Sequence, residues 1–269
     1  MNNPDISFIG CGNLATAVIT GILSNRPELA AHITVSDRYT EKALLLQERW
    51  PIRILPDNAL CASSADILFL TVKPAQYEEV IAEIRSSVKP DAVVVSVGAG
   101  VSISYVENTF GSGAKIIRIM PNTPALVSEG MVGICPGTAA TQQDLKNVSE
   151  ILSLCAKVEQ ITEDLFDVVT GVSGSGPAYV YMFIDAMARA AEKDGMDRRQ
   201  AVAFAAQTAK GAAKMVLESG IDPETLTEQV CSPGGTTIEA VQVFRDRDLA
   251  GLVEEAQHAC VEKSRIMHK

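Results

Sequence analysis

Two glycine-rich turns hold the residues of this sequence that are best suited to chemistry. The first follows a short apolar run and reads GCGNLA from Gly10 to Ala15, with a helical pattern continuing to Leu23. A strand, a Gly-x-Gly-x-x-Ala turn and a helix in this order are typical of dinucleotide binding. Gly10 allows the tight turn, and Gly12 lets a pyrophosphate approach the backbone and the positive end of the helix. Glycines in an ordinary strand–helix turn would give the same pattern.

The second turn reads SPGGTT from Ser232 to Thr237 and opens a helix that we expect at Ile238. It offers hydroxyl groups, backbone N–H groups and a helix N-terminus, which together suit an anionic group. An ordinary helix N-cap is the alternative, because serine, threonine and glycine are common there.

A third candidate site follows the strand predicted at residues 32–36. Ser36 is followed by Asp37 and Arg38. An acidic residue at this place favours the free 2′-hydroxyl of NAD, whereas an arginine accommodates the 2′-phosphate of NADP. Ser36 and Arg38 would hold that phosphate if Asp37 turns away, so we favour NADP over NAD. A plain loop start is the alternative.

Two further strands end in proline-containing corners. Lys73 and Pro74 follow the apolar strand at 66–72, and Pro121 to Pro124 follow the strand at 115–120. Ligands bind at strand carboxyl ends in doubly wound sheets, so we expect Lys73 to face a cofactor and the rigid 121–124 corner to contact its nicotinamide. A solvated lysine and a turn without a ligand are the alternatives.

These corners require a sheet that aligns the strand ends. Strands and helices alternate up to about residue 161, which predicts an α/β fold with a mostly parallel, Rossmann-type sheet in residues 1–162. Residues 163–269 are almost entirely helical in pattern, apart from a glycine- and serine-rich break at 171–177. We therefore expect an all-helical second domain there.

The helical half is too apolar to be covered easily by itself. The helix predicted at 178–191 is apolar around most of its circumference, and the one at 199–217 is rich in alanine. Such helices need cover on several sides, and a second copy of the chain is the usual symmetric solution. A self-contained bundle that caps the sheet is the alternative.

Composition excludes several classes of function. The net charge is −10 from 23 basic and 33 acidic residues, so no cationic surface for nucleic acid is indicated. The apolar runs are too short to span a membrane, and the N-terminus does not resemble a secretory signal. The six cysteines and three histidines show no metal-ligand spacing, so we expect reduced thiols, no metal, no histidine base and a cytoplasmic location.

Several motifs together resemble the pyrroline-5-carboxylate reductase family. They are, in order, GCGNLA at 10–15, VKP at 72–74, RIMPNTP at 118–124, GSGPAYVY at 174–181 and SPGGTT at 232–237. The resemblance covers nearly the whole chain. It implies reduction of Δ1-pyrroline-5-carboxylate to L-proline, the last step of proline synthesis, by NADPH or NADH. It also implies a Rossmann domain, an interlocked helical dimerisation domain and, in some members, a decamer of five dimers.

The resemblance also implies site residues. Ser36 and Asn58 correspond to contacts on the adenosine side of the cofactor, and Lys73 and Pro74 correspond to contacts with its middle. Thr237 corresponds to the group that hydrogen-bonds the imine nitrogen and donates its proton, with help from water. The candidate substrate-binding residues are Ser232, Gly234, Gly235, Thr236 and Thr237. The candidate cofactor-binding residues are Gly10, Cys11, Gly12, Asn13, Leu14, Ser36, Arg38, Asn58, Val72, Lys73, Pro74, Gly98, Ala99, Met120, Pro121 and Asn122.

Two other classes of function compete with this hypothesis. A β-hydroxyacid dehydrogenase also joins a Rossmann half to a helical half, but it needs a lysine in the first helix after the linker. Residues 179–191 contain none, and Lys210 and Lys214 lie in a later helix. A nucleotide-sensing protein without turnover is the second competitor, and the intact SPGGTT turn argues against it.

Overall fold

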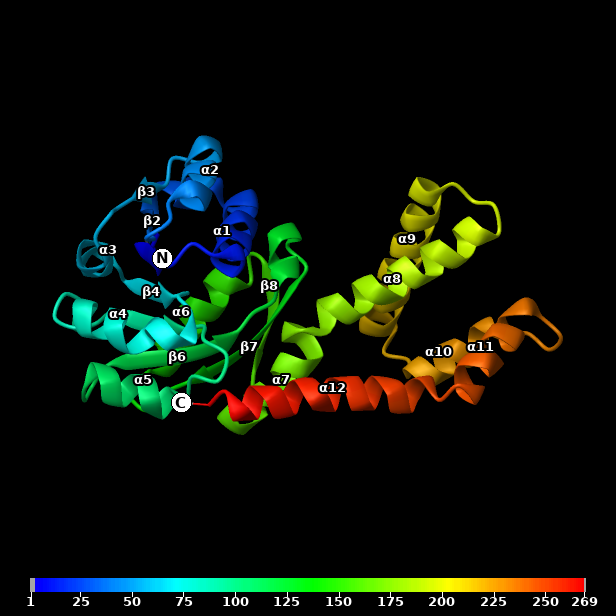
Figure 1. Ribbon diagram of the computed structural model, residues 1–269. Coiled ribbons are helices and arrows are strands. Elements are labelled where there is room, and N and C mark those ends of the chain that lie inside the picture. Colours follow the sequence, from blue (N-terminus) through cyan, green and yellow to red (C-terminus); the bar gives the residue numbers. More distant parts are fainter. Residues whose placement is uncertain (1–2, 269) are drawn as a thin grey trace. The chain divides into compact units, whose positions relative to one another are not determined.

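The computed structural model describes residues 3–268, and within them eight strands form one sheet in the order β3-β2-β1-β4-β5-β6-β7-β8 (Figure 1). The strands are β1 (Ile6–Ile9), β2 (Ile33–Ser36), β3 (Arg53–Ile54), β4 (Ile67–Leu70), β5 (Val93–Ser96), β6 (Lys115–Met120), β7 (Gly130–Pro136) and β8 (Ala156–Gln160). Neighbouring strands are parallel except β6 and β7, which are antiparallel. The expected mostly parallel, Rossmann-type sheet is confirmed.

Helices connect these strands and cover both faces of the sheet. Those of the sheet region are α1 (Asn13–Asn25), α2 (Glu41–Arg49), α3 (Asn58–Ser64), α4 (Tyr77–Ile84), α5 (Ile103–Phe110), α6 (Gln142–Leu152) and α7 (Phe166–Val169). Shorter 3₁₀ segments are η1 (Pro27–His32), η2 (Pro74–Gln76), η3 (Thr123–Val127) and η4 (Glu163–Leu165), and η5 (Thr170–Gly174) is a π-helical turn.

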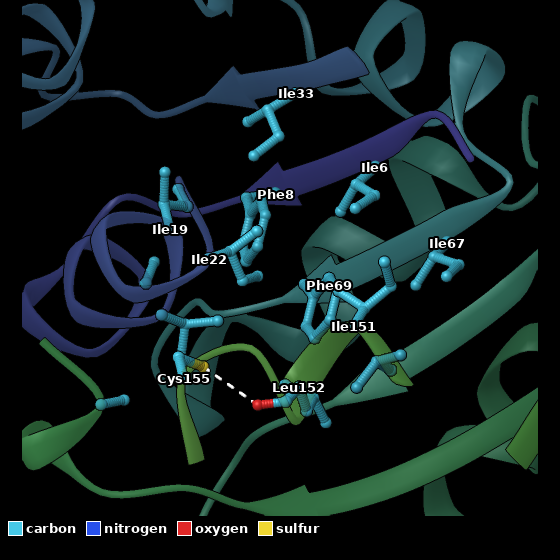
Figure 2. Packing of buried hydrophobic residues seen from close by; sticks show 14 of the residues in the cluster. Ile6, Phe8, Ile19, Ile22, Ile33, Ile67, Phe69, Ile151, Leu152 and Cys155 are labelled. Carbon is cyan, nitrogen blue, oxygen red and sulfur yellow. Dashed lines mark hydrogen bonds between the residues drawn. The ribbon is translucent and has the colours of Figure 1, made fainter. Parts of the chain in front are cut away.

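The central strands are buried on both faces because their side chains alternate. Ile6 and Phe8 of β1 join a core cluster beneath α1, α2 and α6, whereas Ile9 joins a second cluster beneath α3, α4 and α5. In the first cluster Phe8 stacks on Phe69 of β4, with ring centroids 4.6 Å apart (Figure 2). This two-sided packing aligns the strands.

The switch in strand order lies between β1 and β4. Chain connections leave in opposite directions on the two sides of this point, so the loops after β1 and β4 diverge there. The carboxyl ends of β1, β2, β4, β5 and β6 all lie at this edge, because these strands are mutually parallel. The corners that the sequence singled out are therefore brought to one side of the sheet.

The chain divides by packing into two compact units. Unit 1 comprises 1–175 and 260–269, and unit 2 comprises 176–259. The sequence places its boundary at 162/163 instead. The packing division differs because η4, α7 and η5 pack with the sheet region, as does the C-terminal end of α12 (Leu249–Ile266).

Unit 2 is helical throughout its regular structure. Its other helices are α8 (Gly176–Lys193), α9 (Arg198–Ser219), α10 (Pro223–Val230) and α11 (Thr236–Asp246). Helices α8 and α9 pack against each other (Figure 1). Ala188 of α8 and Ala201 and Ala205 of α9 form the buried cluster between them. Many large apolar side chains of this unit stay exposed, including Met182 at 73% and Phe204 at 67%.

Most elements lie where the sequence predicts them, and the ends differ for local reasons. Helix α6 begins at Gln142, because Thr141 and Asp144 form a capping box. Helix α11 begins at Thr236 rather than Ile238, because Gly235 occupies the N-cap position. No helix of residues 3–268 is long and apolar enough to cross a membrane.

Candidate functional site

The first glycine turn is packed tightly against the end of β4. Gly10 has a φ of +98°, and a Cβ atom there would lie 2.8 Å from the carbonyl carbon and oxygen of Thr71. The hydroxyl of Thr71 donates to the Gly10 carbonyl at 2.7 Å. Only glycine satisfies both the positive φ and this close approach, so the turn and the β4 end form one rigid unit.

Gly12 offers the space and the donors that a phosphate needs. It is the N-cap of α1, no side chain caps that helix, and a Cβ atom on Gly12 would meet nothing within 4 Å. The first N–H groups of α1 are therefore free to bind an anion at the positive end of the helix. The turn fits a dinucleotide pyrophosphate.

Cys11 lies in this turn but is not a reactive thiol. Its side chain is 2% exposed, and burial is the largest influence that raises the pKa of the Cys11 thiol. The sulfur therefore stays protonated near neutral pH. Cys11 contributes its backbone to the turn instead.

The end of β2 does not have the arrangement that the sequence requires for a phosphate clamp. Asp37 has not turned away, because its carboxylate accepts hydrogen bonds from the backbone N–H groups of Cys11 and Tyr39. Arg38 is exposed, and its guanidinium lies 3.8 Å from the Glu79 carboxylate. Asp37 and Arg38, the acidic and basic candidates for contact with the adenosine ribose, therefore both remain at the end of β2.

Ser36 and Asn58 form a pair beside that corner. The Ser36 hydroxyl donates to Asn58 Oδ1 at 2.8 Å, and Asn58 Nδ2 donates to Glu83 at 2.8 Å. Asn58 is the first residue of α3, whose N-cap Asp57 accepts from the Leu60 N–H. Two residues that are 22 positions apart are thus held together at the β2 end.

The loops after β4 and β5 carry the next candidates. Val72, Lys73 and Pro74 lead into η2, and the Lys73 side chain is exposed. Gly98 is buried, and a Cβ atom there would lie 2.7 Å from Val101 Cγ2. Ala99 follows Gly98 and is half-buried. Small residues after β5 are therefore a packing requirement.

The corner after β6 is fixed by Asn122. Its side chain is 8% exposed, donates to the Ser173 carbonyl at 3.0 Å and accepts from the Met131 N–H at 2.9 Å. Met120 and Pro121, which precede it, are buried too. The corner is thus joined to η5, and Ser173 is a supporting residue that the sequence did not single out, although it lies in the predicted glycine–serine break.

The second glycine turn belongs to unit 2. Gly234 has a φ of +69°, and the Gly235 N–H donates to the Ser232 carbonyl at 2.9 Å. A Cβ atom on Gly235 would collide with the Ser232 hydroxyl. Gly235 caps α11 without a side-chain hydrogen bond, which leaves the N–H groups of the first turn, including those of Thr236 and Thr237, available to a ligand.

The structure thus gathers the candidates into two sets. The cofactor candidates lie in unit 1 at the carboxyl ends of five strands, and Ser232, Gly234, Gly235, Thr236 and Thr237 lie in one turn of unit 2. The first set can hold an extended anionic cofactor. The second can hold a small anion and presents the half-buried hydroxyl of Thr237 beside it.

Comparison with known proteins gives one consistent answer. Residues 163–267 match the family described as pyrroline-5-carboxylate reductase dimerisation, and residues 5–100 match the family of coenzyme F420-dependent NADP oxidoreductases. The chain is 44% identical to pyrroline-5-carboxylate reductase of Escherichia coli over 98% of both chains. Its fold matches that of a pyrroline-5-carboxylate reductase from Coxiella burnetii, with 32% identity, full coverage of both chains and a TM-score of 0.89. It also matches the pyrroline carboxylate reductase of Plasmodium falciparum with NADP bound, with 29% identity, full coverage of both chains and a TM-score of 0.90.

Proposed function

Because the chain belongs to the pyrroline-5-carboxylate reductase family, we propose that it reduces the cyclic imine of Δ1-pyrroline-5-carboxylate to L-proline with NADPH. The observation that carries the proposal is the similarity over the full length, 44% identity across 98% of the chain. The two anion-binding turns support it, because each supplies one half of what the reaction needs.

The residues of unit 1 would hold and orient the cofactor. The N–H groups at the start of α1 bind the pyrophosphate, while Asn13 and Leu14 begin the helix that presents them. Lys73 and Pro74 would hold the middle of the cofactor, and Met120, Pro121 and Asn122 would contact its nicotinamide. When bound, NADPH supplies the hydride.

Arg38 would favour NADPH over NADH by pairing with the 2′-phosphate by itself, because the Ser36 hydroxyl is bonded to Asn58 and the Asp37 carboxylate is bonded to the first glycine turn. Its guanidinium is exposed and lies 3.8 Å from the exposed Glu79 carboxylate, and exposed ion pairs are weak, so it is able to reorient. Asp37 would instead accept a hydrogen bond from the 2′-hydroxyl of NADH. We therefore propose NADPH as the cofactor, with NADH as the alternative. The variant Arg38→Ala distinguishes the two.

The residues of unit 2 would hold the substrate. Its carboxylate binds the N–H groups and hydroxyls of the SPGGTT turn at the positive end of α11. The Thr237 hydroxyl donates to the imine nitrogen. A threonine hydroxyl is a weak acid, so water or an already protonated imine shares the transfer of that proton. A protonated imine accepts hydride readily, so holding the ring against the nicotinamide provides much of the rate acceleration.

The working form we propose is a homodimer through the helical domain, with a decamer of five dimers as the larger assembly. Exposed apolar side chains on α8 and α9, such as Met182 and Phe204, support an interface there. We place the protein in the cytoplasm, where the free thiols of its six cysteines would persist.

A direct assay separates this proposal from its competitors. The purified protein is incubated with NADPH and Δ1-pyrroline-5-carboxylate, and both cofactor oxidation and L-proline are measured. Stoichiometric formation of proline and NADP⁺ is the expected result. Turnover on a 3-hydroxyacid with NADP⁺ instead would identify a β-hydroxyacid dehydrogenase. Cofactor binding without turnover on any of these substrates would identify a sensing protein.

A further inference from the structure

Tyr77 is a fully buried tyrosine whose hydroxyl lies between two strand ends. It is the first residue of α4 and is 0% exposed. Its hydroxyl donates to the Leu70 carbonyl at 2.9 Å and accepts from the Val97 N–H at 3.0 Å and from the Ser96 hydroxyl at 3.3 Å. Leu70 ends β4, Ser96 ends β5 and Val97 directly follows it, so one oxygen joins both strands at their carboxyl ends.

The ring of Tyr77 also supports the loop that follows β5. A Cβ atom on Gly98 would lie 3.1 Å from two ring carbons of Tyr77, so the ring lies directly against the Gly98 backbone. The same side chain therefore fixes the loop by a hydrogen bond at Val97 and by packing at Gly98.

These contacts continue to the first glycine turn. Thr71 follows Leu70, and its hydroxyl donates to the carbonyls of Ile9 and Gly10 at 3.0 and 2.7 Å. The glycine turn is thus joined to the β4 loop by Thr71, and the β4 loop is joined to the β5 loop by Tyr77. All three loops belong to the candidate cofactor site.

We propose that Tyr77 is a positioning residue for the cofactor. Its side chain fixes the loop at Val97–Ala99 relative to the loop at Thr71–Pro74. The inference rests on the proposed NADPH-dependent function. Tyr77 acts through the two loops and touches neither cofactor nor substrate.

The hydroxyl keeps this role across the working pH range. Burial is the largest influence that raises the pKa of the Tyr77 phenol above its usual value of 10.0. The group therefore stays a neutral donor to Leu70. Removing only the hydroxyl leaves the Val97 N–H buried without its acceptor, a loss that the loop relieves by moving.

Tyr77→Phe tests the proposal because it keeps the ring and deletes one atom. The dissociation constant of NADPH is measured by fluorescence titration without substrate, together with kcat, the KM of pyrroline-5-carboxylate and the melting temperature. We expect cofactor binding to weaken about tenfold, which matches the loss of one buried hydrogen bond. The KM of the substrate at saturating NADPH should stay within about twofold, since the substrate turn keeps its own hydrogen bonds.

Tyr105→Phe is the matched control, because that ring packs against the same core cluster from α5. Weaker NADPH binding in the Tyr77 variant alone supports the proposal. Unchanged NADPH affinity in Tyr77→Phe overturns it. Equal weakening in both variants, in step with their melting temperatures, also overturns it, because that result shows a general loss of stability. A wild-type protein that does not bind NADPH would refute the proposed function instead.

A measurement on the wild-type protein keeps the proposal testable if Tyr77→Phe does not fold. Amide hydrogen exchange of the cofactor-free protein should show the Val97 amide to be protected, since it is bonded to the Tyr77 oxygen, and the Ala99 amide to exchange faster. Exchange at Val97 as fast as at Ala99 overturns the proposal.

Discussion

At the scale of single residues, Thr237 is the residue that we propose as the donor to the imine nitrogen. It is half-buried in the first turn of α11, directly after the Gly235 cap. In Thr237→Ala we expect kcat to fall about 100-fold, at the lower end of what positioned proton transfer contributes. The NADPH dissociation constant should stay within about twofold, since the cofactor turn is a different part of the chain. Steady-state kinetics and fluorescence titration measure the two quantities.

Thr227→Ala is the control for that variant. Thr227 lies on helix α10, where its hydroxyl donates to the Pro223 carbonyl at 2.9 Å. Its replacement should leave kcat unchanged. Normal turnover in Thr237→Ala would remove Thr237 from the proton path.

Arg38 provides a second test at this scale. Arg38→Ala should raise the NADPH dissociation constant about tenfold, which is the low end for a charge-assisted hydrogen bond at an exposed site. The constant for NADH, which lacks the phosphate, should change less than twofold. Arg49→Ala is the control, because Arg49 stacks on Trp50 at the end of α2. Equal weakening of both cofactors by Arg38→Ala would show that Arg38 does not contact the 2′-phosphate.

At the scale of elements, the end of α12 is bound to α7 by a buried carboxylate. The Asp167 Oδ1 atom accepts from the Ser264 hydroxyl at 2.6 Å and lies 2.8 Å from His268 Nε2. Burial raises the pKa of Asp167, but the hydrogen bonds from Ser264 and His268 outweigh it and hold the pKa below 3.8. The folded state therefore favours the ionised form.

A lowered pKa fixes the direction of a pH effect. The stability that ionised Asp167 contributes is fully present above the unfolded pKa of 3.8 and is lost as pH falls through the lower folded value. The wild type should lose more unfolding free energy than Asp167→Asn between about pH 5 and pH 2. Chemical denaturation at several pH values measures this, with Asp164→Asn as the exposed control. Parallel pH profiles for the wild type and Asp167→Asn would contradict the prediction.

At the scale of the whole molecule, the exposed apolar surface of unit 2 predicts association. Phe204 and Leu217 on α9 are 67% and 74% exposed. We expect sedimentation to give at least twice the 28.6 kDa mass of one chain, and Phe204→Glu to shift it towards the monomer, because a buried carboxylate without a partner is costly. Lys210→Glu, on the same helix, is the control for charge. A wild type that sediments as a monomer would refute the proposed dimer, and ten chains would identify the decamer.

Local patterns in the sequence were sufficient to predict most of the elements. The short apolar run before Gly10 indicated a strand, and the helical pattern of residues 163–269 indicated the helices of the second half. The tight turn at Gly10 was also predictable from the sequence, because a positive φ is a conformation that glycine itself favours. These features are set by neighbours in the chain, and similarity over the whole length then identified the family.

Only the tertiary structure decided how distant groups pair. It turned the Asp37 carboxylate towards the Cys11 N–H, joined Asn122 to Ser173, and placed the Tyr77 hydroxyl between β4 and β5. None of these partners is predictable from distances along the sequence. Each hydrogen bond depends on which strands become neighbours in the sheet and on which side chains are buried away from solvent. The sequence determined the elements and their chemistry, and packing determined the contacts that support the candidate cofactor site.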